Sequence, residues 1–182
     1  MNRQIPNALT VLRVLSIPVL LWSYLAPLEK GWLPVLLFLA IGLTDWLDGF
    51  LARRWQVESK FGAFLDPAAD KLLVVSILVV LVGEQNSLYF TIPALLVIFR
   101  ELLMSMMREF IAKTNMPDVL AVDKWGKYKT TSQMLSLGFF LVPSAWGQYP
   151  AYVLFYLSTA LTCMSLCRYV LKLVEAPKPK LA

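Results

Sequence analysis

The chain has 182 residues, 58% of them hydrophobic, and a formal net charge of +5. Soluble domains are typically about 45–50% apolar, so this composition indicates a membrane protein and excludes a second large domain. The sequence has no histidine, which excludes imidazole general-base catalysis and histidine-ligated metals. The positive charge suits a membrane surface with anionic lipids, and we expect no nucleic-acid partner.

The hydrophobic pattern predicts an all-α integral membrane protein with six transmembrane helices, each of about 20 residues. An amphipathic segment over residues 1–13 is expected at the interface before the first span, because Asn7, Thr10 and Arg13 share one face and apolar residues the other. The predicted spans are residues 14–28, 32–52, 62–82, 88–110, 128–142 and 151–173. We treat residues 1–182 as a single membrane domain, with a flexible tail over about 175–182 that is rich in proline and lysine.

The distribution of positive charge predicts the orientation of the chain. Six spans would place both termini on one side, together with the polar connections 53–61 and 113–127. Every Lys and Arg except Lys30 falls on or near that side. The positive-inside rule therefore assigns the termini and the aspartates described next to the cytoplasm.

Four aspartates interrupt the apolar sequence at helical spacing. Asp45 and Asp48 are three residues apart, and Asp66 and Asp70 are four apart. On a helix each pair lies on one face with Cβ atoms about 5–6 Å apart, where like charges repel and are costly to desolvate. A cation should therefore lie between them, and oxygen ligands favour Mg²⁺ or Mn²⁺.

Two facing pairs of carboxylates could hold two ions, an arrangement suited to in-line phosphoryl displacement. Gly49 and Gly62 fit this interpretation because they leave space for a ligand close to the carboxylates. The alternative, a solvated loop between two spans, does not require carboxylates at two helical spacings. Pro67 follows Asp66 directly, so either Asp66 caps a helix or the helix starts earlier and kinks there.

The pattern from Asp45 to Asp70, Asp-x2-Asp-Gly-x2-Ala-Arg-x8-Gly-x3-Asp-x3-Asp, resembles the signature of the CDP-alcohol phosphatidyltransferase family at all eight fixed positions. The resemblance implies two bound Mg²⁺ or Mn²⁺ ions, a homodimer, a CDP-lipid donor such as CDP-diacylglycerol, and CMP as leaving group. The implied metal ligands are Asp45, Asp48, Asp66 and Asp70, with Asp70 also the catalytic base. The implied contacts to the CDP moiety are Asn7, Gly49, Ala52, Arg53, Ser59 and Gly62.

Cations on the fourth and fifth predicted spans are candidates for binding a phosphate on the acceptor. They are Arg100, Arg108, Lys127 and Lys129. Arginine forks suit phosphate geometry. The alternative is that these side chains reach the interface and pair locally with Glu101 and Glu109. The stretches Arg-Glu-x6-Arg-Glu and Trp-Gly-Lys-Tyr-Lys-Thr resemble the bacterial family members that use glycerol 3-phosphate, which implies that acceptor and a bacterial cytoplasmic membrane.

Other functions remain open at this point. The same chemistry could use phosphatidylglycerol, inositol phosphate or serine as acceptor, although the four cations favour a phosphorylated alcohol over serine. Intramembrane acids could also mark a divalent-cation transporter. The four aspartates gather at one predicted edge, however, and leave no acidic relay to the other side.

Overall fold

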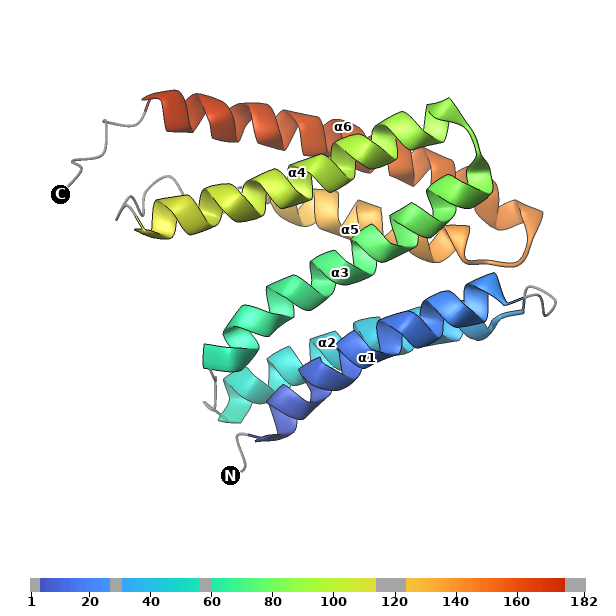
Figure 1. Cartoon of the computed structure of the whole chain (residues 1–182), viewed down its shortest axis with the longest axis horizontal. Coiled ribbons are helices and arrows are strands. Elements are labelled where there is room, and N and C mark those ends of the chain that lie inside the picture. The colour runs from blue at the N-terminus through green and yellow to red at the C-terminus, as the bar shows by residue number, and fades with distance from the viewer. Residues whose placement is uncertain (1–3, 27–30, 56–59, 114–123, 176–182) are drawn as a thin grey trace. The chain divides into compact units, whose positions relative to one another are not determined.

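The computed structural model describes residues 4–26, 31–55, 60–113 and 124–175, and within these ranges the chain forms helices and no strand (Figure 1). The helices are α1 (Gln4–Leu25), α2 (Leu33–Trp55), α3 (Lys60–Gln85), α4 (Leu88–Lys113), α5 (Lys124–Phe140) and α6 (Ala145–Glu175). The predicted all-α class is confirmed. The predicted tail, from residue 176 onward, lies outside the described residues.

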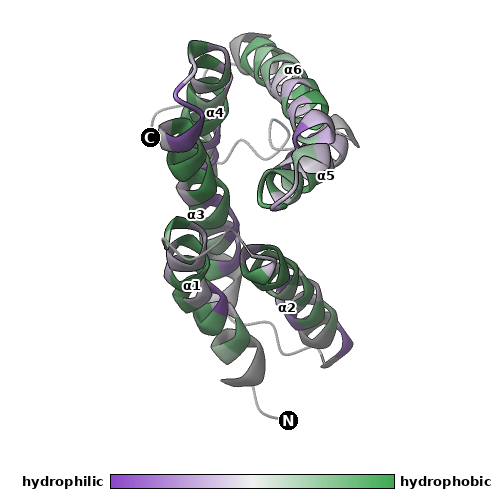
Figure 2. Cartoon of the chain, turned by 90° about the vertical axis from the view of Figure 1, so that its right-hand side faces the viewer, coloured by the Kyte–Doolittle hydropathy of each residue, from purple (hydrophilic) through white to green (hydrophobic). Residues whose placement is uncertain are grey.

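Within the described part of the chain, four helices are long and apolar enough to cross a membrane, and by this measure the chain is a membrane protein. The spanning stretches are Ala8–Leu25, Leu33–Phe50, Leu88–Glu109 and Ala145–Leu171. Apolar residues cover much of these helices in Figure 2. The first half of α3 carries Asp66, Asp70 and Lys71, and α5 has only 17 residues and is more polar. Six spans therefore stay a prediction.

The first predicted element differs from the structure. Residues 4–25 form one continuous helix, so the amphipathic segment is the first part of α1 and not a separate interfacial element. Its polar residues Thr10 and Arg13 are buried. The physical reason is that their partners are acidic side chains of other helices, and a sequence pattern in α1 alone does not reveal them.

Prolines lie inside four of the helices: Pro18 in α1, Pro67 in α3, Pro93 in α4 and Pro150 in α6. Pro67 is in α3, which begins seven residues earlier at Lys60, so Asp66 does not cap the helix. Pro150 is in α6, which begins at Ala145, six residues before the predicted start of the sixth span at residue 151. Prolines inside apolar helices are tolerated where neighbouring helices satisfy the freed backbone groups. Ser136 of α5 donates a hydrogen bond to the carbonyl of Ala151, beside Pro150, at 2.9 Å.

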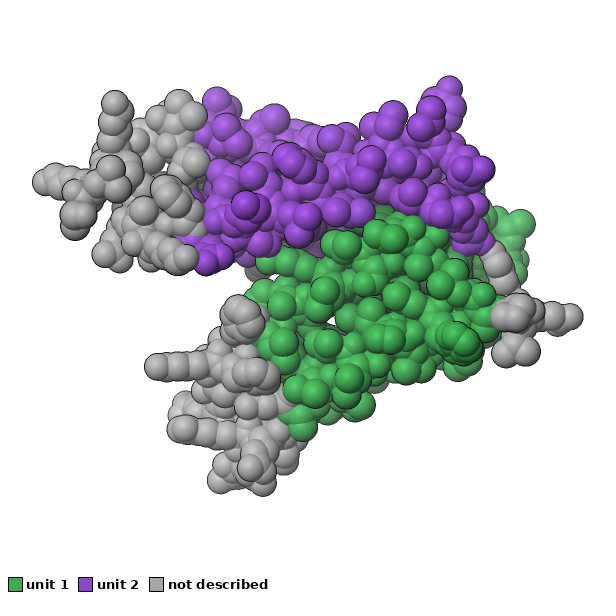
Figure 3. All heavy atoms as spheres, viewed as in Figure 1, with its two compact units in different colours: residues 1–81, 137–149 green, residues 82–136, 150–182 purple. Residues whose placement is uncertain are grey.

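Two compact units make up the chain (Figure 3). Unit 1 comprises residues 1–81 and 137–149, and unit 2 comprises residues 82–136 and 150–182. In unit 1, α1 packs against α2. In unit 2, the rings of Phe90 and Phe155 stack with centroids 4.7 Å apart, and Tyr152 donates a hydrogen bond to Gln85 at 2.5 Å. The single domain predicted for residues 1–182 stays a prediction.

The turn between α5 and α6 depends on Gly147. A Cβ atom there would lie 2.9 Å from Cβ of Val142 and 3.0 Å from the carbonyl oxygen of Phe139. We expect Gly147→Ala to lower the free energy of unfolding by about 1–3 kcal/mol, because overpacking forces the backbone to shift. The measurement is thermal unfolding in detergent. Gly42→Ala is the control, since a Cβ at this helical glycine meets nothing within 4 Å, and equal unfolding temperatures for the two variants would contradict the prediction.

Candidate active site

Arg13 on α1 is the centre of a charged cluster in unit 1. Its side chain is 1% exposed, and its guanidinium contacts both aspartates of α2. Nη1 lies 2.5 Å from Oδ1 of Asp45, and Nη2 donates a hydrogen bond to Oδ2 of Asp48. Asp48 is buried, whereas Asp45 is about half exposed. The two carboxylates lie one turn apart on α2, so a single planar fork can contact both.

The aspartates of α3 meet the same helix. Oδ1 of Asp70 lies 3.5 Å from Nη1 of Arg13. Oδ1 of Asp66 accepts a hydrogen bond of 2.8 Å from the hydroxyl of Thr10, which is one turn before Arg13. Asp70 is about half exposed. Polar residues of α1 therefore contact all four predicted aspartates, and their role as metal ligands stays a prediction.

The charge of this cluster is strongly negative. Four carboxylates and one guanidinium sum to a formal charge of −3, in the part of unit 1 where α1 and α2 are apolar enough to cross a membrane. Within the described ranges, no three acidic side chains lie close enough together to hold one ion, and three of the aspartates contact Arg13. The donor chemistry still fits a hard divalent cation, since every acidic ligand is a carboxylate oxygen. Three of the four carboxylates contact the guanidinium of Arg13.

The predicted nucleotide contacts fall partly outside the described residues. Ser59 and the side chains of Asn7, Ala52 and Arg53 lie outside the described residues. Gly49 lies on α2 and Gly62 on α3, within one turn of Asp48 and Asp66 respectively, and Gly62 is buried. Their predicted role stays a prediction.

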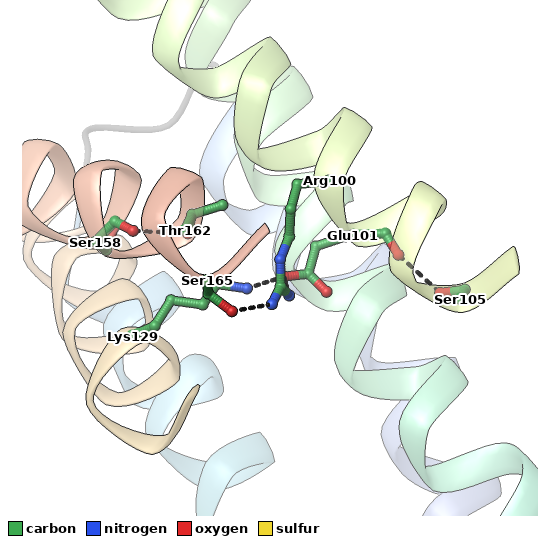
Figure 4. A network of polar contacts seen from close by, with 7 residues as sticks. All are labelled: Arg100, Glu101, Ser105, Lys129, Ser158, Thr162 and Ser165. Atoms are coloured by element: carbon green, nitrogen blue, oxygen red, sulfur yellow. Dashed lines mark hydrogen bonds and ion pairs between the residues drawn. The ribbon is translucent and has the colours of Figure 1, made fainter. Parts of the chain in front are cut away.

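A second charged cluster lies in unit 2, where α4, α5 and α6 each contribute a side chain (Figure 4). Nη1 of Arg100 lies 3.2 Å from Oε1 of Glu101, and Lys129 donates a hydrogen bond to the same oxygen. Nη2 of Arg100 donates a hydrogen bond of 3.0 Å to the hydroxyl of Ser165. Arg100 and Lys129 are buried. Arg100 and Lys129, two of the four predicted acceptor cations, therefore belong to one cluster, and Glu101 contacts both.

The other two predicted acceptor cations are Arg108 and Lys127. Arg108 is exposed on α4. The side chain of Lys127 lies outside the described residues. The pairing of Arg100 and Lys129 with Glu101 is the local ion pairing considered above as the alternative to phosphate binding. It does not exclude a phosphate, because the two cations and one carboxylate leave a net charge of +1.

Three residues of these clusters were missed from the sequence. Arg13 and Thr10 were assigned to an interfacial face, although a cation inside an apolar helix usually has an acidic partner, which was a usable signal. Ser165 is one of several hydroxyl residues on α6, and nothing in its spacing distinguishes it.

Comparison with known proteins now decides the family. The sequence profile of the CDP-alcohol phosphatidyltransferases matches residues 3–164. The chain belongs to the CDP-alcohol phosphatidyltransferase family. It is similar to a protein of Haemophilus influenzae named CDP-diacylglycerol–glycerol-3-phosphate 3-phosphatidyltransferase, with 42% identity over 93% of both chains. Proteins of the same name from Escherichia coli (strain K12) and Salmonella choleraesuis are each 40% identical over 93% of this chain and 94% of their own.

The family assignment confirms the resemblance stated on the aspartate pattern. The matched region contains all four aspartates together with Arg13, Arg100, Glu101 and Lys129. A cation transporter is accordingly no longer the competing function, because the family is one of phosphatidyltransferases.

Proposed function

We propose that this chain transfers the phosphatidyl group of CDP-diacylglycerol to glycerol 3-phosphate and releases CMP, a step of phosphatidylglycerol biosynthesis. The observation that carries the proposal is the convergence of three signature aspartates on Arg13. It occurs in a chain whose relatives of 40–42% identity are named for this reaction. The similarity to these relatives extends over nearly the whole chain, so it supports the proposed acceptor-binding residues as well as the aspartate signature.

The four aspartates are the proposed ligands of two divalent ions. Members of this family generally depend on a divalent metal. When bound, the ions neutralise the diphosphate of the donor and stabilise the departing CMP. Asp48 is held by Arg13 and Asp66 by Thr10, so α1 positions one ligand on each of α2 and α3. The half-exposed Asp45 and Asp70 remain open to a ligand from solvent.

Asp70 is the proposed general base. In the reaction, a hydroxyl oxygen of the acceptor forms a bond to the phosphatidyl phosphorus, the bond from that phosphorus to the bridging oxygen of CMP breaks, and the hydroxyl proton passes to a carboxylate. Asp70 suits this role because it is about half exposed and its contact with Arg13, at 3.5 Å, is the longest of the three. Asp48 is buried against the guanidinium and is less accessible.

Arg100 and Lys129 are the proposed binding groups for the phosphate of the acceptor. They are buried cations whose partners within the described residues include one carboxylate, so the cluster keeps a net charge of +1. A dianionic phosphate group gains from charge-assisted hydrogen bonds to such groups. Arg108 and Lys127 complete the set proposed from the sequence.

The test of the proposed function is release of CMP from CDP-diacylglycerol with a panel of acceptors. The purified protein in detergent should release CMP with glycerol 3-phosphate. It should do so far more slowly with glycerol, serine, inositol phosphate or phosphatidylglycerol. Faster release with inositol phosphate or phosphatidylglycerol would replace the proposed acceptor while leaving the donor chemistry in place.

Loss of an acceptor cation should act on one substrate only. Lys129→Gln is expected to raise the KM for glycerol 3-phosphate by about ten- to a hundredfold, because removing one charged hydrogen bond costs about 1.5–3 kcal/mol. The KM for CDP-diacylglycerol should change by less than about threefold, since its diphosphate is bound by other residues. Steady-state kinetics with each substrate varied in turn measures both values. An equal increase in both KM values would indicate that Lys129 stabilises the packing of the helices and does not bind the acceptor.

We also propose a multi-pass protein of the bacterial cytoplasmic membrane, with both termini and the aspartates on the cytoplasmic side. The bias of Lys and Arg supports this orientation. Exposed aromatic residues at the other ends of the unit 1 helices suit the opposite interface, where Trp and Tyr are enriched. They are Trp22, Trp32, Trp146 and Tyr149. The homodimer implied by the family resemblance stays a prediction.

Cysteine labelling tests this orientation. Single cysteines at positions 59 and 148, replacing Ser59 and Gln148, are introduced into a variant without Cys163 and Cys167. A membrane-impermeant maleimide should label position 148 in intact cells and position 59 only after the membrane is opened. The reverse pattern would show that the charge bias does not set the topology.

A further inference from the structure

One carboxylate oxygen joins the two buried cations of unit 2. Arg100 and Lys129 come from different helices, α4 and α5, and both contact Oε1 of Glu101 (Figure 4). Glu101 is itself mostly buried, with a side chain that is 15% exposed. Its backbone carbonyl accepts a hydrogen bond of 2.7 Å from Ser105. Because both cations contact Oε1, the position of this side-chain oxygen sets how closely the two cationic groups approach each other.

Without Glu101 these two cations would not stay together. Like charges in a poorly solvated site repel strongly, and each loses solvation as well. The described surroundings of Arg100 add only a neutral hydroxyl, that of Ser165. Arg108 adds further positive charge that acts on Lys129. Glu101 is the negative charge that contacts both cations.

The cluster has donors that Glu101 does not use. A lysine ammonium has three N–H donors and a guanidinium has five. Nε of Arg100 is buried and has no hydrogen-bond acceptor among the described residues. A buried donor without an acceptor is costly, which points to a ligand as the missing acceptor. A phosphate with several acceptor oxygens and a negative charge matches both the donors and the net charge of +1.

We propose that Glu101 is the positioning residue of the acceptor site, which holds Lys129 and Arg100 at a spacing where both bind one phosphate. This inference rests on the proposed function. Glu101 does not contact the acceptor and acts through the two cations. The chemical class of ligand is a small phosphomonoester, and glycerol 3-phosphate is the probe.

The experiment is a double-mutant cycle on the two KM values. Glu101→Gln keeps the size of the side chain and removes its charge, and we expect it to raise the KM for glycerol 3-phosphate about tenfold, with the KM for CDP-diacylglycerol and kcat within about twofold. Combined with Lys129→Gln it should raise the KM for glycerol 3-phosphate by less than the product of the two single increases, because Glu101 acts in part through Lys129. Glu84→Gln, the same charge change on an exposed residue, is the control and should leave both KM values unchanged.

Two results would overturn the inference. One is a double variant whose KM for glycerol 3-phosphate rises by the product of the two single fold-increases. The other is an equal increase in the KM of both substrates, which would mean that Glu101 only neutralises charge and does not position the cations. If Glu101→Gln does not fold, the same KM values are measured for Glu101→Asp. It keeps the charge but is one methylene shorter, and should raise the KM for glycerol 3-phosphate about threefold without changing that for CDP-diacylglycerol.

The inference and the proposed function fail in different ways. No CMP release by the unaltered protein with glycerol 3-phosphate would reject the proposed function. Normal release by that protein, together with an equal change of both KM values in Glu101→Gln, would reject the positioning role alone.

Discussion

Asp45→Ala, Asp48→Ala and Asp66→Ala are each expected to reduce CMP release by about 1000-fold or more, equivalent to roughly 4 kcal/mol of transition-state stabilisation. Each variant removes a proposed metal ligand, so the ions that would neutralise the diphosphate of the donor would be bound less tightly. Activity should disappear in excess chelator and return with either Mg²⁺ or Mn²⁺, since both accept oxygen ligands. The measurement is the rate of CMP release in detergent, with binding of Mn²⁺ followed separately by electron paramagnetic resonance.

The controls separate catalysis from folding. Glu84→Ala removes an exposed acid of α3 outside the cluster and should retain full activity. The aspartate variants should insert and elute from size exclusion like the unaltered chain. Full activity in chelator, or in any one of the three variants, would remove the proposal of two ions held by aspartates.

Arg13→Met is expected to be the most destabilising single substitution in unit 1. Removing one partner of a buried ion pair typically costs about 3–5 kcal/mol, and here it leaves the buried carboxylate of Asp48 without its guanidinium. For a chain of this length each kcal/mol changes the unfolding temperature by about 2–4 °C, so a decrease of roughly 6–20 °C is expected. Thermal unfolding in detergent measures it.

Arg13→Lys tests whether charge alone is sufficient. A lysine provides one ammonium and cannot reproduce the fork that contacts Asp45 and Asp48, so only part of the lost stability should return. Arg54→Met is the matched control. Arg54 is exposed and lies over the ring of Phe50 at 5.9 Å, a contact typically worth about 0.5–1 kcal/mol. If Arg13→Met and Arg54→Met unfold at the same temperature, the buried cluster does not stabilise the fold.

The aspartate pairs could be predicted because their chemistry and helical spacing coincide within a short stretch. Asp45 and Asp48 lie on one helix and Asp66 and Asp70 on another, as the spacing indicated. The pairing of Arg100 with Glu101 could be predicted for a related reason, since a cation in an apolar helix needs an anionic partner or ligand.

The partners of these residues were harder to predict from one sequence. Arg13 and Asp70 are 57 positions apart, and only tertiary packing brings them together. Ser165 contacts Arg100 across 65 positions, and its hydroxyl resembles those of its neighbours on α6. The start of α6 was placed too late because Pro150 suggests a turn, whereas the helix begins at Ala145 and includes it.

The contact between Arg13 and aspartates of later helices has a consequence for how the chain is made. The first helix leaves the ribosome before its acidic partners exist, and Asp70 follows Arg13 by 57 residues. At about 5–20 residues per second this delay is on the order of several seconds. During that time the first helix enters the membrane with an unpaired cation near its N-terminal end. In the proposed orientation Arg13 would reach the cytoplasmic headgroups until the next two helices arrive, so correct insertion of α1 would be coupled to the synthesis of α2 and α3.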